Sequence, residues 1–206
     1  MKILHIDSSP FVGTSVTREL SATVVAELLE RNPTASVTYR DLGTAPPAHL
    51  SAAAMSMFHN AQDEVITPAL QQEIDAIYQS IEELMASDVI VLGAPMYNHS
   101  ISSNLKAWLD QICQKGITFI YRPEGVKGLV SDKKVFIASS RGGIYSSEEG
   151  RLHDFQEPYL VSILALMGMN DVTVLCAEGV SKSAIGRELA LKQARATLLQ
   201  ALDAPL

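Results

Sequence analysis

The stretch Ala94–His99 combines residue types that suit a flat, polar ligand. It follows an apolar run over residues 88–93 that is typical of a buried parallel strand, and an amphipathic helical pattern comes after it. Met96 and Tyr97 can pack against a planar ring, and the backbone N–H groups of residues 97–99 can donate to the polar edge of a heterocycle. The alternative is a capped turn in which Tyr97 is a half-buried core residue.

The segment between the first apolar run and the first helical pattern is rich in hydroxyls, reading SSPFVGTSVT over residues 8–17. Free N–H groups and the positive end of a helix dipole favour a phosphate there, and Ser or Thr hydroxyls complete its coordination. The alternative is that Thr14 or Ser15 only caps the helix. The loop lacks the GxGxxG pattern of dinucleotide-binding folds and the GxxxxGK[ST] pattern of NTPases, and it has no cysteine nucleophile. It therefore suits a monophosphate that is held and not cleaved.

A third segment, residues 139–145, reads SSRGGIY and follows another apolar run. Gly142 and Gly143 would let the backbone approach a ligand closely, or they would supply the positive φ of an ordinary turn. Arg141 is expected to be a solvated side chain or the partner in a structural ion pair.

Hydrophobic periodicity indicates alternating strands and helices along almost the whole chain. The expected strands cover Lys2–Asp7, Val37–Tyr39, 88–93, Lys133–Ser139 and Val172–Ala177. The expected helices cover Ser15–Arg31, Pro68–Met85, 103–114, 156–167 and Ser183–Leu202. Residues 43–67 are interpreted as a long surface excursion, Ile117–Tyr121 as a short β-like run and Pro123–Lys127 as a loop.

This alternation requires right-handed crossovers and predicts a three-layer, doubly wound α/β fold, with a five-stranded parallel sheet of order 2-1-3-4-5. The order reverses between strands one and three, so the loops after them should flank one crevice. The segment after strand four should join them there. One phosphate, one flat ring and one polar edge together describe a bound flavin mononucleotide (FMN).

The chain has 206 residues, 47% of them hydrophobic, which allows one substantial core and favours a single domain over residues 1–206. Its net charge of −7 and its lack of a basic run argue against nucleic acid or an anionic membrane as a partner. Cys113 and Cys176 have no CxxC spacing, which suits a reducing cytoplasm. Metal-ligand spacing is also absent among His5, His49, His59 and His153. We therefore expect no metal, no transmembrane helix and a cytoplasmic location.

Several blocks of the sequence together resemble the FMN-dependent NADH-azoreductases of bacteria, a flavodoxin-like family that also reduces quinones. The blocks are IDSS at 6–9, RDL at 40–42, APMYN at 94–98, LK at 105–106, GITF at 116–119, GLV at 128–130, SRGG at 140–143 and AEG at 177–179. The MYN and RGG blocks are specific in combination. The chain departs from the family at His99, where members commonly have Phe, and at Ser102, where they often have Pro.

The resemblance implies a flavodoxin-like fold with one non-covalent FMN per subunit. It implies phosphate contacts from Ser9, Ser15, Val16 and Thr17. It implies contacts to the isoalloxazine ring from Pro95, Met96, Tyr97, Asn98, His99, Ser140, Arg141, Gly142 and Gly143. It also implies a homodimer, in which Phe119 and Tyr121 are candidate aromatic residues of the substrate pocket.

The implied activity is reduction of azo compounds and quinones by NADH or NADPH, through ping-pong hydride transfer on the flavin. The cofactor carries the redox chemistry, so no catalytic side chain is required, and the N–H groups of the turn at 97–99 would stabilise negative charge on the ring. Proton donation by His99 is a further hypothesis. The alternative functions are a flavodoxin-type electron carrier and a nucleotide-binding regulator, although the segments at 43–67 and 117–130 favour a walled substrate pocket.

Overall fold

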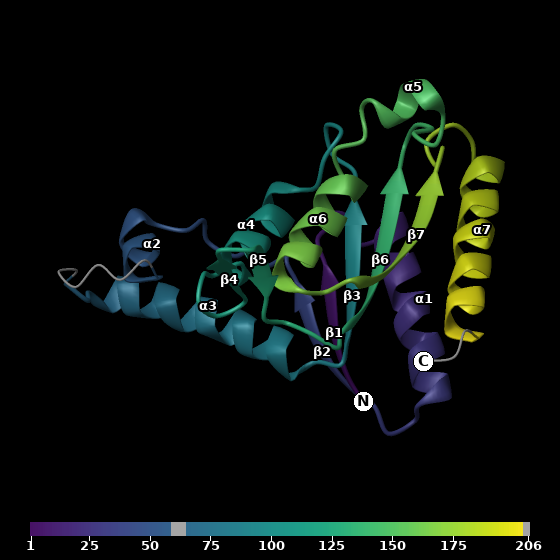
Figure 1. The fold of residues 1–206 in the computed structure, drawn as a ribbon. Helices are drawn as coiled ribbons and strands as arrows, with labels where there is room; N and C mark the ends of the chain where they lie inside the picture. The colour runs from purple at the N-terminus through teal and green to yellow at the C-terminus, as the bar shows by residue number, and fades with distance from the viewer. Residues whose placement is uncertain (59–64, 204–206) are drawn as a thin grey trace.

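The computed structural model describes residues 1–58 and 65–203, in which strands and helices alternate (Figure 1). The strands are β1 Lys2–Asp7, β2 Ser36–Asp41, β3 Val89–Pro95, β4 Phe119–Arg122, β5 Gly125–Gly128, β6 Lys134–Arg141 and β7 Asp171–Glu178. The helices are α1 Val16–Arg31, α2 Ala52–Phe58, α3 Pro68–Ala86, α4 Ser103–Ile112, α5 Glu148–Arg151, α6 Glu157–Met167 and α7 Ala184–Asp203.

Five of the described strands form one parallel sheet in the order β2-β1-β3-β6-β7. The predicted order 2-1-3-4-5 is the same arrangement, because the predicted fourth and fifth strands are β6 and β7. The intervening β4 and β5 form a separate antiparallel hairpin. Since the five sheet strands run in one direction, their carboxyl ends lie at one edge of the sheet (Figure 1).

One face of the sheet is covered by α1 and α7 (Figure 1). Val24 of α1, Leu198 of α7 and Phe136 of β6 belong to one buried apolar cluster. Ion pairs also join the two helices at the surface, namely Arg187–Glu19, Arg195–Glu27 and Arg31–Asp203. Solvent-exposed pairs contribute little stability each, so the apolar contact is the main link between the helices.

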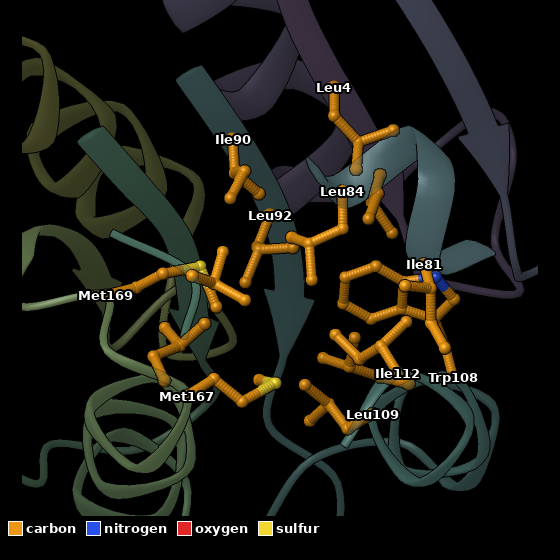
Figure 2. Close-up of a cluster of buried hydrophobic side chains, with 14 of the residues drawn as sticks. Leu4, Ile81, Leu84, Ile90, Leu92, Trp108, Leu109, Ile112, Met167 and Met169 are labelled. Atoms are coloured by element: carbon orange, nitrogen blue, oxygen red, sulfur yellow. The ribbon is translucent and has the colours of Figure 1, made fainter. Parts of the chain in front are cut away.

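The opposite face of the sheet is covered by α3, α4 and α6 (Figure 1). Ile74, Ile77 and Ile81 recur at helical spacing and give α3 one buried side. Trp108 of α4 is 3% exposed and belongs to this core. Figure 2 shows side chains from α3, β3 and α4 meeting here with Met167 at the end of α6.

Three segments differ from the sequence prediction. The excursion predicted over 43–67 contains α2, which is rich in alanine and therefore shows no apolar stripe, although its Ala54 is fully buried. His59 of the same excursion lies outside the described residues. The loop predicted over Pro123–Lys127 contains β5, which is too short and too exposed to show alternation. No helix was predicted at α5, because its residues carry no apolar period.

Four strands run further than predicted, since β2 and β7 are longer than expected as well as β3 and β6. The extensions of β3 and β6 lie at the edge where two of the loops begin. β3 continues through Ala94 to Pro95, and β6 continues through Ser140 to Arg141. The additional register pairs place Pro95 opposite Ser140. A proline is accepted here because it is the last residue of its strand.

Candidate functional site

Three loops meet at the carboxyl edge of the sheet, where β1, β3 and β6 end (Figure 1). The Ser8 N–H donates to the Gly93 carbonyl at 3.1 Å and joins the first loop to β3. The Met96 N–H donates to the Ser140 carbonyl at 2.9 Å and joins the second loop to β6. The structure thus brings the three predicted segments together.

The loop after β1 leads into the first turn of α1. Ser15 is the N-cap, since its hydroxyl accepts from the Arg18 N–H at 3.4 Å, and it lies 3.0 Å from the Thr17 hydroxyl. The capping interpretation of Ser15 is therefore confirmed. No hydrogen bond among the described residues engages the N–H groups of Val16 and Thr17, although Thr17 is fully buried. The helix start therefore keeps two donors for an anion.

The turn after β3 is a two-residue hairpin turn. Tyr97 and Ser100 exchange backbone hydrogen bonds of 2.9 and 3.0 Å, and the residues between them have positive φ, 49° at Asn98 and 69° at His99. Asn tolerates this left-handed conformation well, whereas at His99 it is strained. Both residues are exposed, and within the described ranges their N–H groups have no hydrogen-bond partner. Tyr97 is half-buried, as its alternative interpretation proposed, but it lines a cavity and does not belong to the described apolar clusters of the core.

The two glycines after β6 are Gly142 and Gly143, and of these Gly142 lies close to a neighbouring side chain. Neither Gly142 nor Gly143 has a positive φ, so the interpretation as a turn requiring one is wrong. A Cβ atom on Gly142 would lie 2.9 Å from the Ser181 hydroxyl. The N–H groups of both glycines have no hydrogen-bond partner in the described part of the chain. This loop adds two more free donors to the edge.

The Arg141 side chain is buried in an ionic cluster and is only 4% exposed. Its Nη2 lies 2.9 Å from the Asp154 carboxylate and 3.0 Å from that of Glu157, and its Nε donates to Gln156 at 3.1 Å. The structural ion pair expected from the sequence is therefore confirmed. The alternative expectation, that the Arg141 side chain is solvated, is wrong. Arg141 fixes the start of α6 through these contacts.

Residues 144–155 form a wall beside the turn at 97–100. The Phe155 N–H donates to the His99 carbonyl at 2.9 Å. The His99 Nδ1 lies 3.4 Å from the Tyr145 hydroxyl, and the His99 ring centroid lies 5.5 Å from that of His153. The exposed His99 side chain therefore lies beside two other polar aromatic groups, Tyr145 and His153.

Glu178 at the end of β7 anchors the other end of this wall. Its carboxylate accepts from the N–H groups of Tyr145 at 2.7 Å and Ser146 at 3.1 Å. Burial raises the pKa of Glu178, but hydrogen bonds from Ser146 and Tyr145 outweigh burial and keep the pKa below its ordinary value. The anchor is therefore a charged carboxylate at neutral pH.

A cavity of about 830 Å³ opens between the loops that follow β1, β2 and β3. Pro10 and Tyr97 contribute to its lining, together with Lys106 of α4 and Tyr159 of α6. The crevice predicted between the loops that follow strands one and three, which are β1 and β3, is therefore present. Of the residues predicted to contact FMN, its lining includes Tyr97 and Asn98 but not Ser9, Ser15–Thr17, Pro95, Met96, His99 or Ser140–Gly143.

The predicted aromatic residues of the substrate pocket lie on the β4–β5 hairpin. Phe119 is buried, and Tyr121 is 64% exposed with its ring 5.5 Å from that of Phe119 in an edge-on arrangement. No contact in the described ranges joins either ring to the turn at 97–100 of the same chain. Within one chain the structure does not bring these two residues to the site.

The sequence analysis missed a buried polar cluster next to the loop after β1. Asp7 is 3% exposed, and its carboxylate accepts from the Ser21 hydroxyl at 2.7 Å and from the Tyr39 hydroxyl at 3.0 Å. Burial raises the pKa of Asp7, but hydrogen bonds with His5, Ser21 and Tyr39 lower it below its ordinary value. Burial and the nearby Asp7 charge raise the pKa of Tyr39 to about 12. The available signal was the pair His5 and Asp7, two ionisable residues at alternate positions of a strand whose other buried residues are apolar.

Residues 1–58 and 65–203 contain neither a cluster of metal ligands nor a membrane-spanning helix. No three His, Cys, Asp or Glu side chains gather closely enough there to hold a metal ion. None of the helices in these ranges is both long and apolar enough to cross a membrane.

Residues 1–202 match the model of a protein family described by its flavodoxin-like fold. The chain belongs to this family. The flavodoxin-like α/β fold expected from the motifs is therefore confirmed.

Relatives in the flavodoxin-like family match almost the whole chain. The FMN-dependent NADH:quinone oxidoreductase of Azospirillum brasilense is 44% identical over 196 residues, which cover 95% of this chain and 94% of the relative. A protein of the same name from Chromobacterium violaceum is 45% identical over 180 residues, which cover 87% of this chain and 89% of that one.

Solved structures show the same architecture. An azoreductase from Bacillus anthracis str. Sterne has a TM-score of 0.88 at 22% identity and covers 98% of each chain. An FMN-dependent NADH-azoreductase from Bacillus anthracis str. Ames Ancestor, in complex with FMN, has a TM-score of 0.86 at 20% identity, over 98% of this chain and 100% of that one. At these identities the likeness establishes the fold.

Proposed function

We propose that this chain is an FMN-dependent NADH:quinone oxidoreductase that also reduces azo compounds, and that residues 1–206 form one FMN-binding domain. The names of the two relatives support the NADH:quinone reaction. The motifs that resemble azoreductases support the azo reaction. The names of these relatives describe enzymes that reduce a quinone. They do not favour an electron carrier without a small-molecule acceptor.

The observation that carries the proposal is the gathering of free backbone donors at one edge of the sheet. Among the described residues, N–H groups without a hydrogen-bond partner occur at the start of α1, at Val16 and Thr17, and in the two other loops, at Asn98, His99, Gly142 and Gly143. A buried N–H without an acceptor is costly, so the donors in the first turn of α1 fit a bound anion. The donors of the two other loops fit a planar polar ring. FMN combines both groups, so the residues present fit this cofactor.

The residues proposed to hold FMN come from the three loops. Those proposed for the phosphate are Ser9, Ser15, Val16 and Thr17. Those proposed for the ring are Pro95, Met96, Tyr97, Asn98, His99, Ser140, Arg141, Gly142 and Gly143. For Arg141 the contact would come from its backbone, because its side chain is bound to Asp154 and Glu157.

The chemistry that FMN supplies when bound is acceptance of a hydride from NADH and its transfer to the acceptor. The N–H groups of Asn98 and His99 would donate to the polar edge of the ring and stabilise negative charge there. The wall at 144–155 would limit the access of water to that end of the crevice. The His99 ring, beside the Tyr145 hydroxyl, would hold a proton for the acceptor at Nδ1.

We also propose that the protein acts as a cytoplasmic homodimer. The support is the family resemblance together with the exposure of Tyr121, 64%, on a hairpin away from the site of its own chain. In a dimer Phe119 and Tyr121 would complete the substrate pocket of the other subunit.

The test starts from the visible spectrum of the purified protein after incubation with FMN. We expect a flavin spectrum that bleaches when NADH is added under argon, and steady NADH oxidation when menadione is then supplied. NADPH is assayed in parallel. A protein that cannot be loaded with FMN contradicts the proposal, and bleaching without turnover of any quinone or azo acceptor would favour the electron carrier.

A further inference from the structure

The Arg18 guanidinium is hydrogen-bonded to the backbone of the loop that follows β1. Arg18 lies in the first turn of α1, and its side chain is 11% exposed. Its Nε and Nη2 both donate to the Ser9 carbonyl, at 3.2 and 2.7 Å. Ser9 is one of the proposed phosphate ligands, so the side chain acts on the residue that would hold the phosphate.

The same guanidinium is fixed on its other side by the end of β2. Its Nη1 and Nη2 donate to the two carboxylate oxygens of Asp41 at 2.9 and 2.5 Å, and Nη1 also donates to the Tyr39 hydroxyl at 3.1 Å. Asp41 in turn accepts from the N–H groups of Gly43 and Thr44 at 3.0 and 3.2 Å. Arg18 therefore ties the loop after β1 to the loop after β2.

The arrangement leaves Arg18 no donor for a ligand. A guanidinium has five N–H groups, and the hydrogen bonds to Ser9, Asp41 and Tyr39 engage all five. Space is equally limited, because a Cβ atom on Gly43 would lie 2.0 Å from the Ser9 carbonyl oxygen. Any effect of Arg18 on a bound phosphate is therefore exerted through the loop and through its charge.

The charge matters because two carboxylates lie beside the loop. Arg18 pairs with Asp41 and lies 3.7 Å from the Asp7 carboxylate, which is 4% exposed. Without the guanidinium these two anions would face a phosphate dianion with no compensating charge.

We propose that Arg18 is a positioning residue of the phosphate site, which holds Ser9 in place and neutralises Asp7 and Asp41, so that the site accepts a phosphate monoester. This inference rests on the proposed function. It predicts that Arg18 governs affinity for the phosphate of FMN and has little influence on the ring.

The matched control is Arg40, which is adjacent to Asp41 in the sequence. It forms a comparable two-bond pair with Glu83 of α3, at 2.6 and 2.5 Å, and has no contact with the loop after β1 in the described residues. Arg40→Gln removes the same charge and the same number of ion-pair hydrogen bonds without touching the proposed phosphate site.

The experiment compares the dissociation constants of FMN and riboflavin, which lacks the phosphate, by flavin fluorescence titration of the flavin-free full-length chain. Wild type should prefer FMN. Arg18→Gln should weaken FMN binding by about tenfold or more, the effect of losing a charge-assisted contact, and should change riboflavin binding by less than about twofold. Arg40→Gln should leave both constants close to wild type.

Equal losses for FMN and riboflavin would reduce Arg18 to a general structural residue and overturn the inference, as would unchanged FMN binding. If Arg18→Gln does not fold, Arg18→Lys decides by the same ratio. It keeps the charge but lacks the planar fork, so it should still lose FMN affinity selectively. A wild-type protein that binds neither flavin contradicts the proposed function itself, which separates the two failures.

Discussion

The two ends of the crevice are held by different kinds of contact. At the proposed phosphate end, the buried charges of Asp7, Arg18 and Asp41 fix the loop after β1. At the ring end, the exposed residues Asn98 and His99 occupy a strained turn that is steadied by backbone hydrogen bonds. The rigid contacts at the first end suit the recognition of one chemical group, the proposed phosphate. The second can change its side chains without changing the backbone donors, which suits an enzyme whose acceptors vary.

Removal of the Arg141 side chain should have the largest effect on stability. Arg141→Gln leaves the Asp154 carboxylate, 10% exposed, without its cation, and we expect a loss of about 3 kcal/mol in the free energy of unfolding. Urea denaturation measures it. The control is Arg187→Gln, which breaks an exposed pair with Glu19 and should cost less than about 1 kcal/mol. Equal losses in the two variants would mean that the wall at 144–155 is not held by this cluster.

The phosphate end should tolerate no added atom beside Ser9. Gly43→Ala places a Cβ atom 2.0 Å from the Ser9 carbonyl oxygen, so we expect about 2 kcal/mol of destabilisation together with weaker FMN binding. Gly13→Ala in the same region has nothing within 4 Å of the new atom and should be close to neutral. Thermal denaturation and FMN titration of both variants test this contrast. A harmless Gly43→Ala would show that the contact between the two loops is loose.

Acid should lower the free energy of unfolding, because carboxylates at both ends of the crevice become protonated. The carboxylates at the phosphate end should contribute more to this loss. The pKa values of Asp7, Asp41 and Glu178 are lowered in the folded protein. Their stabilisation is therefore complete above the unfolded value, about 4, and is lost as the pH falls through the lower folded values. Unfolding in urea between pH 7 and pH 3 measures this dependence. Asp7→Asn should remove more of it than Glu178→Gln, because Asp7 is the more deeply buried. The reverse order would contradict the comparison of the two ends.

His99→Phe should have the smallest effect on cofactor binding. In the proposed site, position 99 contributes its backbone N–H, so FMN affinity should change by less than about twofold, the scale of a surface substitution. The KM for quinones should change, because the His99 ring faces Tyr145 and His153. The pH–rate profile tests proton donation, and a profile identical to wild type removes that hypothesis. His153→Phe is the control, since it alters a neighbouring ring and leaves the turn intact.

The sequence was sufficient for the sheet and for the loops at its edge. Apolar runs identify β1, β3 and β6, and the parallel order follows from the crossovers. It was not sufficient for α2, whose alanines carry no stripe, or for the turn at 97–100, where His99 is an unusual choice for positive φ. The pairing of Arg18 with Asp41 was also out of reach. These residues are 23 positions apart on different elements, and no local sequence pattern predicts their contact.

The junction of α1 with α7 has a consequence for synthesis of the chain. The pairs Glu19–Arg187 and Glu27–Arg195 each bridge 168 positions, and Val24 is covered by a cluster to which Leu198 belongs. A nascent polypeptide that ends before residue 184 lacks α7, so the apolar side chains of α1 that pack in this cluster are left without their α7 partners. We expect such truncated chains to be held by chaperones or to aggregate, because this side of the molecule closes only after α7, Ala184–Asp203, has been synthesised.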